Sequence, residues 1–296
     1  MTLRILHKTN IDFIKRRHIF FAISALVTLT GIISMSIKGL DLGLDFTGGT
    51  LMQVKFDKPV EIGALRSALE TAGVEASIQS FATDNSYAIK VKGTQENVNE
   101  TANKIIGALK TLQGSSFTEE KRDYVGPVVG RDLAKKAMFA IILSMFGIIV
   151  YVAFRFSNPV WGTAGVIGLM HDVFVAMTAM SLFNREIDLV IVAAFLTIAG
   201  YSINDTIVIF DRMRENMKNF PKMRLGELIN LSINECLSRT IITTCTVFFV
   251  VLVLFLFGGM AINNFAFAML IGTITGVYST IFICSPIVYQ WEHRAK

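Results

Sequence analysis

Two charged residues lie inside or beside long apolar stretches of the chain, and their types suit the movement of an ion. Asp205 lies within the apolar run 189–210, and Arg239 lies near the start of the next run, 234–257. An ionisable side chain inside a lipid bilayer costs at least about 2.5–3.5 kcal/mol, so its presence there points to a function. If the two runs form neighbouring helices, the carboxylate and the guanidinium lie at similar depth. The pair then either couples an ion to a change in helix packing or locks two helices together.

Three other polar residues in these apolar runs are candidates for an ion path. Asp172 follows His171 near the middle of the run 160–183, and such a pair suits either a proton path or a packing hydrogen bond within a helix bundle. Asn204 directly precedes the first of the two charged residues, and Thr243 follows the second by one helical turn. We therefore predict that an ion path, if one exists, includes Asp172, Asn204 and Thr243.

The composition predicts an integral membrane protein. Of the 296 residues, 52% are hydrophobic and 17% are charged, whereas a soluble domain has about 25% charged residues. This balance excludes an ordinary cytosolic enzyme, a disulfide-stapled secreted module and a disordered chain. An apolar run of about 18 residues or more is long enough to cross a bilayer. The sequence contains six such runs: 19–37, 137–154, 160–183, 189–210, 234–257 and 265–289.

The distribution of basic residues predicts the orientation in the membrane, because Lys and Arg concentrate in cytoplasmic segments. Five precede the first run and six lie between residues 211 and 239, whereas the loops after the third and fifth runs contain one and none. We therefore interpret the net charge of +5 as a signal for membrane orientation, and we expect no binding to nucleic acid. The predicted segments are a cytoplasmic tail (1–18), a first helix (19–37), an outer domain (38–136), a five-helix bundle (137–290) with a cytoplasmic loop (211–233), and a cytoplasmic tail (291–296).

The outer segment has the pattern of a small α+β domain. Period-two alternation predicts strands, and apolar residues at helical spacing predict helices. The segment contains no cysteine or histidine, so we expect neither a metal site nor a nucleophilic centre there. The predicted order is strand-helix-strand-strand-helix-strand, the ferredoxin-like arrangement, at 50–56, 61–72, 74–81, 87–92, 95–112 and 117–125.

The sequence also lacks the common motifs of hydrolytic enzymes. It has no G-x-x-x-x-G-K-[ST] phosphate loop, no H-E-x-x-H zinc motif and no G-x-S-x-G nucleophile motif. Its three cysteines have no C-x-x-C spacing. We therefore expect no ATPase or hydrolase activity, no metal and no cofactor.

Five short motifs, taken in their order along the chain, resemble one family. They are Asp45-Phe46-Thr47-Gly48-Gly49 after the first run, VGPVVG at 125–130 before the second, His171-Asp172 in the third, GYSINDTIVIFDRMREN at 200–216, and Ser238-Arg239-Thr240 at the start of the fifth. Together with the order of one span, an outer domain and five further spans, they resemble the SecF family, the smaller membrane subunits of the bacterial SecDF protein-export complex. The resemblance covers essentially the whole chain.

The resemblance implies an α-helical membrane fold of the RND superfamily, with six transmembrane helices and a periplasmic α+β domain, in the bacterial inner membrane. It implies that the chain acts with SecD in late steps of preprotein export, driven by the proton gradient or, in some members, by sodium. The other implied partners are YajC, the SecYEG channel, the unfolded preprotein and the lipid bilayer. By motif match, Asp205 and Arg239 are the ion-coupling residues. The flanking motifs then form a hinge of the outer domain, with Asp45, Phe46, Gly48, Gly49, Gly126, Pro127 and Gly130.

Two other functions stay open on the sequence. One is half of a transporter for small molecules or lipids, because RND folds export these as well. The other is an assembly subunit without transport activity, whose buried charges are structural. Accumulation of secretory precursors on depletion would favour export, whereas altered drug susceptibility alone would favour the first alternative.

Overall fold

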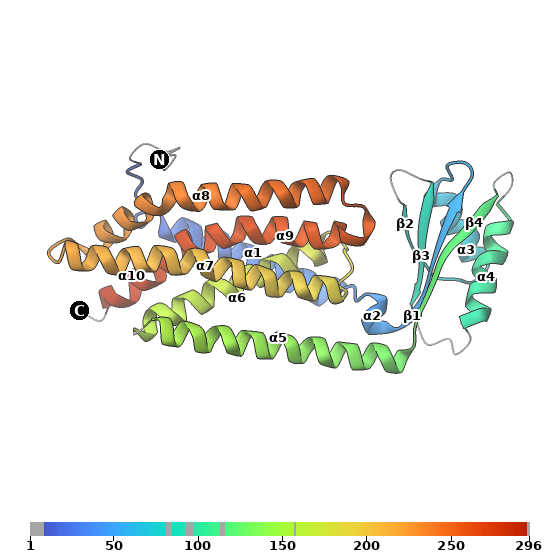
Figure 1. The fold of residues 1–296 in the computed structure, drawn as a ribbon, viewed down its shortest axis with the longest axis horizontal. Helices are drawn as coiled ribbons and strands as arrows, with labels where there is room; N and C mark the ends of the chain where they lie inside the picture. The colour runs from blue at the N-terminus through green and yellow to red at the C-terminus, as the bar shows by residue number, and fades with distance from the viewer. Residues whose placement is uncertain (1–8, 81–84, 93–97, 113–115, 157, 295–296) are drawn as a thin grey trace.

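A computed structural model describes residues 9–80, 85–92, 98–112, 116–156 and 158–294. The chain forms a bundle of long helices with a small sheet domain at one end (Figure 1). The first long helix begins, and the last helix ends, at the end of the bundle away from the sheet domain (Figure 1). The predicted tails 1–18 and 291–296 include residues 1–8 and 295–296, which lie outside the described residues.

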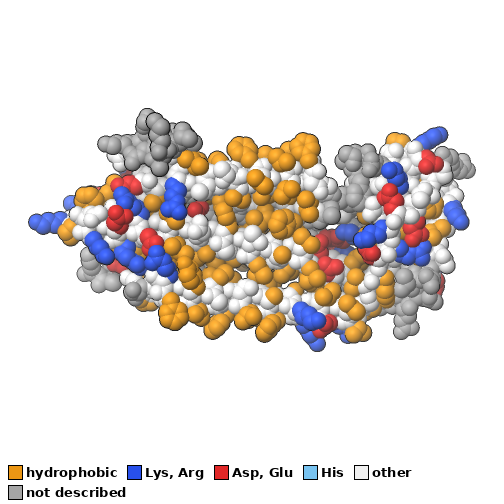
Figure 2. Space-filling model, viewed as in Figure 1, with side chains coloured by type: hydrophobic (Ala, Val, Ile, Leu, Met, Phe, Trp, Pro, Cys, Tyr) orange, Lys and Arg blue, Asp and Glu red, His pale blue; other side chains and the backbone are white. Residues whose placement is uncertain are grey.

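Six helices among the described residues are long and apolar enough to cross a membrane, which confirms the predicted number of spans. Hydrophobic side chains cover the middle of the bundle, and charged side chains gather at its ends (Figure 2). The sixth span is α9, which continues through a single π-helical turn (η1) into α10. The helices are α1 (Arg17–Lys38), α5 (Pro127–Arg155), α6 (Pro159–Leu182), α7 (Leu189–Asn219), α8 (Leu225–Phe257), α9 (Met260–Ser279), η1 (Thr280–Cys284) and α10 (Ser285–Arg294).

Several helices extend beyond the apolar runs that predicted them. α5 begins at Pro127, ten residues before the predicted start of the second span, because proline at the first helical position is favourable and the helix continues past its charged residues. The predicted loop 211–233 is helical except for residues 220–224. An apolar run marks only the part of a helix that contacts lipid, so it underestimates the full length.

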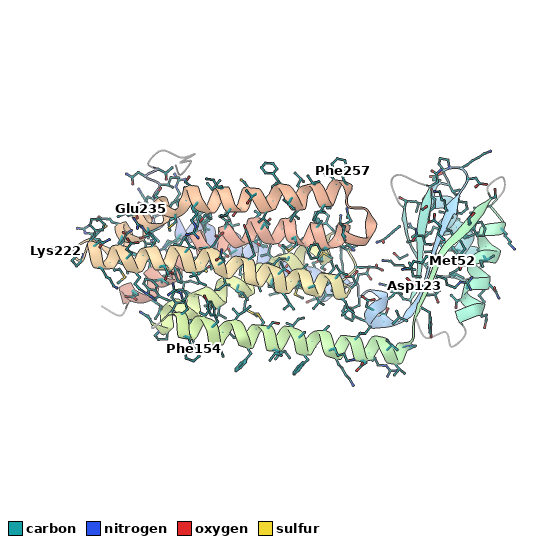
Figure 3. All side chains as sticks on the ribbon, in the orientation of Figure 1. Met52, Asp123, Phe154, Lys222, Glu235 and Phe257 are labelled. Atoms are coloured by element: carbon teal, nitrogen blue, oxygen red, sulfur yellow. The ribbon has the colours of Figure 1, made fainter. Side chains whose placement is uncertain are left out.

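The bundle has an inner and an outer layer of helices. Only 11% of the apolar windows of α1, α5 and α8 are buried, whereas α6, α7 and the sixth span are 50–56% buried. The inner helices α6, α7 and α9 are in mutual contact, and α8 packs on α7 and α9. Lys222, between α7 and α8, lies at the end of the bundle away from the sheet domain, and Phe257 lies at the end next to it (Figure 3). Polar groups on α6, α7 and α9 are therefore the ones that the chain itself can shield from lipid.

The sheet domain has the predicted ferredoxin-like order. Its four strands are all antiparallel in the order β2-β3-β1-β4. Alternate residues of the central strand, Met52, Val54 and Phe56, are buried in one core with residues of both helices. The predicted ranges 74–81 and 95–112 include residues outside the described part of the chain. The elements are β1 (Gly49–Phe56), α3 (Ile62–Thr71), β2 (Ser77–Ser80), β3 (Ser86–Lys92), α4 (Val98–Lys110) and β4 (Phe117–Val125).

Candidate functional site

Asp205 lies in the middle of α7, an inner helix, about 24 Å along the helix axis from its first residue at about 1.5 Å per residue. Its side chain is 6% exposed, and its Oδ2 atom has no hydrogen-bond partner. Nearly all buried polar atoms in proteins are hydrogen-bonded, so a buried carboxyl oxygen without a partner is an exception that needs an explanation. This exception makes Asp205 the first candidate for a functional group.

Arg239 lies on α8, which packs against α7, but it does not pair with Asp205. Its side chain is exposed, and no salt bridge within the described part of the chain joins the two residues. The guanidinium still acts on the carboxyl group electrostatically. Glu235, one turn earlier on α8, does not neutralise Arg239 either, because Arg212 and Asn216 each donate to it at 2.7 Å. The structure therefore places Asp205 and Arg239 on adjacent helices, but no salt bridge forms between them.

Asn204 and Thr243, which were predicted for an ion path, lie on α7 and α8. We define the α7–α8 face by Asn204, Arg239 and Thr243. All three side chains are exposed on this chain. Tyr201, which shares a side of α7 with Asn204, donates a hydrogen bond of 3.2 Å from its hydroxyl to α8. Thr243 donates to the backbone of its own helix, at the carbonyl of Arg239 (2.9 Å). Asn204 and Thr243 thus lie on the outside of the bundle.

The Asp172 cluster is a second polar group, inside the bundle, and it joins three helices. Asp172 is completely buried on α6. Ser202 of α7 and Ser279 of α9 donate hydrogen bonds to its Oδ2 atom at 2.5 and 2.6 Å, and Nδ1 of His171 lies 3.2 Å from Oδ1. The role of Ser279 was not predicted, because a serine within an apolar run more often serves helix packing. Only the fold brings it to the carboxyl group.

The two glycine motifs meet in a joint between the sheet domain and the bundle, which we define as residues 45–49 and 125–130. A short helix, α2 (Leu44–Thr47), is followed by Gly48 and Gly49 with φ of +73° and +142°. A Cβ atom at Gly130 would lie 3.0 Å from the carbonyl oxygen of Phe46 and 3.1 Å from the nitrogen of Gly48. Gly130 therefore allows backbone to pack directly on backbone, and Gly48 and Gly49 adopt conformations that other residues rarely adopt.

The joint also contacts the beginning of α7. The carboxylate of Asp45 accepts a hydrogen bond of 3.0 Å from the backbone nitrogen of Leu189, and Asp188 caps the same helix by accepting one of 2.9 Å from Ile191. Burial raises the pKa of Asp188 above its ordinary value, and the charge of Asp45 acts in the same direction. The first turn of the helix that carries Asp205 is thus held directly by the motif that precedes the sheet domain.

The sheet domain is attached to the bundle by ion pairs as well. Glu186, in the connection between α6 and α7, is 4% exposed and pairs with Lys90 of β3. Lys92 of the same strand pairs with Asp41 and lies 3.7 Å from the other oxygen of Glu186. Because the charges come from both parts of the molecule, they fix the position of the sheet relative to the bundle.

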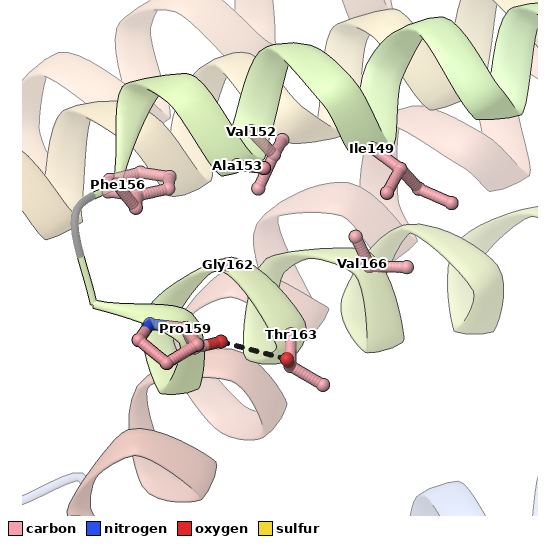
Figure 4. Close-up of a pocket in the computed structure, with 8 residues that line it drawn as sticks. All are labelled: Ile149, Val152, Ala153, Phe156, Pro159, Gly162, Thr163 and Val166. Carbon is pink, nitrogen blue, oxygen red and sulfur yellow. Dashed lines mark hydrogen bonds between the residues drawn. The ribbon is translucent and has the colours of Figure 1, made fainter.

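One groove on the bundle lies apart from these polar groups. A groove of about 370 Å³ lies between α5 and α6, and its lining is almost entirely apolar (Figure 4). Its polar side chain, Thr163, is occupied by a hydrogen bond to Pro159. No group of three or more potential metal ligands occurs in the described parts of the chain. Asp205, Arg239 and the Asp172 cluster are therefore the candidate groups for chemistry.

Comparison with known proteins identifies the family. Residues 104–294 match the C-terminal region of the protein export membrane proteins SecD and SecF, and residues 33–60 match the SecD/SecF GG motif. The protein translocase subunit SecF of Endomicrobium trichonymphae is 41% identical over 99% of this chain and 95% of its own length. SecF of Escherichia coli O157:H7 is 37% identical over 94% of this chain and 87% of its own.

The same relationship is visible in three dimensions. The crystal structure of SecDF from Thermus thermophilus, a translocon-associated membrane protein, superposes on 99% of this chain with a TM-score of 0.86 and 32% identity. SecDF in a super-membrane-facing form gives a TM-score of 0.74. The chain spans 40% of the length of each SecDF chain. This multi-pass membrane protein therefore belongs to the SecD/SecF family of protein export membrane proteins, as a relative of the translocase subunit SecF.

Proposed function

We propose that this chain acts with SecD to promote late steps of preprotein export across the inner membrane, and that a proton or sodium gradient drives it. The observation that carries the proposal is Asp205, a buried carboxyl group with an unpartnered oxygen on a membrane helix. The first turn of that helix is held by Asp45, next to the sheet domain. An ion that binds at Asp205 thus acts on the element that connects the membrane bundle to the outer domain.

The mechanism follows from the charges on α7 and α8. When Asp205 is ionised, the attraction of Arg239 favours closure of the two helices on each other. When the carboxyl group binds a proton, that attraction weakens and the helices adopt a second packing. The change reaches the sheet domain through the first turn of α7 and the joint, which is the role that we assign to Asp45, Phe46, Gly48, Gly49, Gly126, Pro127 and Gly130.

SecD is the proposed partner of the α7–α8 face. Arg239 and Asn204 are exposed on this chain, and exposed polar groups of this kind are costly against lipid. The part of the SecDF chain that matches this chain is 40% of its length, so SecDF also contains a portion that this match does not cover. We assign that further portion to SecD, which covers the face and completes the ion path through Asn204 and Thr243.

The proposed orientation places the sheet domain outside and both tails, 1–18 and 291–296, in the cytoplasm. The excess of basic residues before α1 and between residues 211 and 239 supports it. The bundle end at which α1 begins and α10 ends lies opposite the sheet domain (Figure 1), which agrees with an even number of spans. The energy source is then an ion gradient, because the sequence has no ATPase or hydrolase motif.

The outer domain is the proposed contact for unfolded preprotein, and YajC and the SecYEG channel are the proposed neighbours in the membrane. An extended chain can add to the edge of a sheet by main-chain hydrogen bonds. The two edges differ: β4 carries five consecutive charged residues, 119–123, whereas the short strand β2 carries none. Charges along an edge oppose strand addition, so β2 is the better of the two edges.

The substitution Asp205→Asn tests the function. Asparagine keeps the size of the side chain but cannot gain or lose a proton. We expect a normally folded protein that co-purifies with SecD and does not support gradient-dependent export in inverted membrane vesicles. Asp211→Asn is the matched control, because Asp211 lies on the same helix and pairs with Arg155. Normal export by a well-expressed Asp205→Asn protein would overturn the coupling role.

A further inference from the structure

The hydrogen bonds of Asp172 have the geometry expected for an ionised carboxylate. Its Oδ2 atom accepts from the hydroxyls of Ser202 and Ser279 at 2.5 and 2.6 Å. Distances of about 2.5–2.7 Å are typical of O–H donors bound to a charged oxygen, and such bonds are roughly twice as strong as neutral ones. The carboxylate therefore holds α6, α7 and α9 together by its charge.

No lysine or arginine pairs with this carboxylate in the part of the chain that the structure describes, and its neighbour His171 is a counter-ion only when the imidazole is protonated. The titratable groups around it are His171 on α6, Cys284 on η1 and, one turn further along α7, Asp205. Tyr278 of α9 stacks on the ring of His171 with centroids 6.1 Å apart. The Nε2 atom of His171 is buried and has no hydrogen-bond partner. A charge without a fixed counter-ion at this depth costs several kcal/mol, and a packing contact alone would not require it.

α7 connects the Asp172 cluster to Asp205. Ser202, Asp205 and Thr206 lie at i, i+3 and i+4, on one side of the helix. Thr206 shares a hydrogen bond of 2.8 Å with Thr280, the first residue of the π-helical turn, which directly follows Ser279. Isolated π-helical turns within α-helices occur frequently at functional sites. The two carboxyl groups therefore act on the same side of one helix, and Asp172 also accepts a hydrogen bond from Ser279, the residue that directly precedes the π-helical turn of the sixth span.

We propose that the carboxyl group of Asp172 is a second proton-binding site of the membrane domain, which binds and releases a proton in the same cycle as Asp205. The proposal rests on the function proposed above and adds a residue to it. One proton binds to a carboxylate oxygen and cancels the negative charge, and no other bond forms or breaks. The hydrogen bonds from Ser202 and Ser279 then lose their charge-assisted strength, and α9 is released from α6 and α7 at the π-helical turn.

The substitution Asp172→Asn tests the proposal in vesicles that contain the full chain together with SecD. Two quantities are measured: export as a function of pH, and proton uptake by the purified complex on acidification, followed with a pH indicator. We expect assembly with SecD, loss of gradient-dependent export, and the uptake of one proton fewer per chain. Asp172→Glu should restore part of both signals, because it keeps the carboxyl group.

Ser34→Ala is the matched control. Ser34 and Ser181 form a buried hydroxyl pair of 2.9 Å between α1 and α6, remote from any carboxyl group of the site. The substitution Ser34→Ala also removes a hydrogen bond between helices, and it should leave export and proton uptake unchanged.

If Asp172→Asn does not fold, the double variant Ser202→Ala and Ser279→Ala replaces it. This variant keeps the carboxyl group of Asp172 and removes its hydrogen-bond donors. A proton-binding role predicts that the pH midpoint of uptake moves in this variant.

Unchanged proton uptake and an unchanged pH profile in Asp172→Asn would overturn the proposal, as would an unmoved midpoint in the double serine variant. These results are distinct from a failure of the proposed function. If Asp205→Asn is inactive and Asp172→Asn behaves as the unchanged protein, only the second proton site is wrong. If Asp205→Asn exports normally, the coupling function itself is wrong.

Discussion

The joint and the α7–α8 face differ in how completely this chain satisfies its own polar groups. At the joint, Asp45 caps α7 and Gly130 packs on the backbone of residues 46–48, so these groups find partners within the chain. On the α7–α8 face, Arg239 is exposed, and the buried Asp205, next to Asn204 in the chain, has an unpartnered oxygen. The joint is the part that we propose positions the machinery, and the α7–α8 face is the part that we propose works with a partner.

The largest effect on export is expected for a substitution on the α7–α8 face. Arg239→Ala should abolish gradient-dependent export, because it removes the charge that is proposed to attract Asp205. It should leave the fold intact, because the side chain is exposed and makes no salt bridge to Asp205. Arg239→Lys should be partly active, because lysine keeps the charge but loses the planar guanidinium. Export by vesicles and thermal unfolding in detergent measure the two properties. Unfolding of Arg239→Ala at a clearly lower temperature would contradict the contrast.

The next effect concerns the ion pairs under the sheet domain. Glu186→Gln should destabilise the chain by about 2 kcal/mol, because removing one partner of a buried pair leaves the other charge uncompensated. The lysines Lys90 and Lys92 are partly exposed, which keeps the loss below the range for a fully buried pair. Thermal unfolding in detergent measures the loss, and export should fall only in part. An effect on export as large as that of Arg239→Ala would place Glu186 in the ion-coupling machinery.

A smaller effect is expected within the joint. Gly130→Ala should cost about 1–2 kcal/mol, since its Cβ atom would press on backbone atoms that cannot move aside. Gly147→Ala, in the same helix, is the control, because no atom lies within 4 Å of its Cβ position. That substitution should be neutral or stabilise by up to about 1 kcal/mol. Equal unfolding temperatures for the two variants would show that the close packing at Gly130 has no energetic importance.

The smallest effect is predicted for an exposed ion pair. Arg122 donates two hydrogen bonds of 2.7 Å to Glu119 on β4, which lowers the pKa of that carboxyl group. Because the pKa is lower in the folded chain, the contribution is present above the unfolded pKa and is lost as pH falls through the folded one. Glu119→Gln should therefore cost at most about 0.5 kcal/mol at neutral pH and nothing at acidic pH. A loss equal to that of Glu186→Gln would remove the distinction between buried and exposed pairs.

The sequence predicted well what depends on local pattern. Six spans and the ferredoxin-like order follow from apolar runs and from the alternation of side chains, and both are confirmed. The exact helix ends were missed, because α5 and α8 continue beyond the apolar runs into charged sequence. The apolar run marks the part of a helix that suits lipid, whereas the start of α5 is marked by a proline at its first position.

The candidate site was predictable only in part. Asp205 and Arg239 stand out as charges in apolar sequence, and their roles remain proposals. The partners of Asp172 did not stand out, because Ser202 and Ser279 are 77 residues apart and each resembles an ordinary packing serine. Tertiary structure alone brings such groups together. The same limit applies to Asn204 and Thr243, whose exposure depends on which side of each helix faces the bundle.

The π-helical turn at Thr280–Cys284 sets the rotation of the end of the chain. A π-helical turn accommodates one residue more than an α-helical turn, and one residue corresponds to about 100° of rotation in an α-helix. Removal of a single residue from this turn would restore a continuous α-helix and rotate α10 by that angle relative to α9. Val288, which is completely buried, would turn away from the core, and the exposed Trp291 would move to a different side. One extra residue in the sixth span thus determines which side of the final helix faces the bundle.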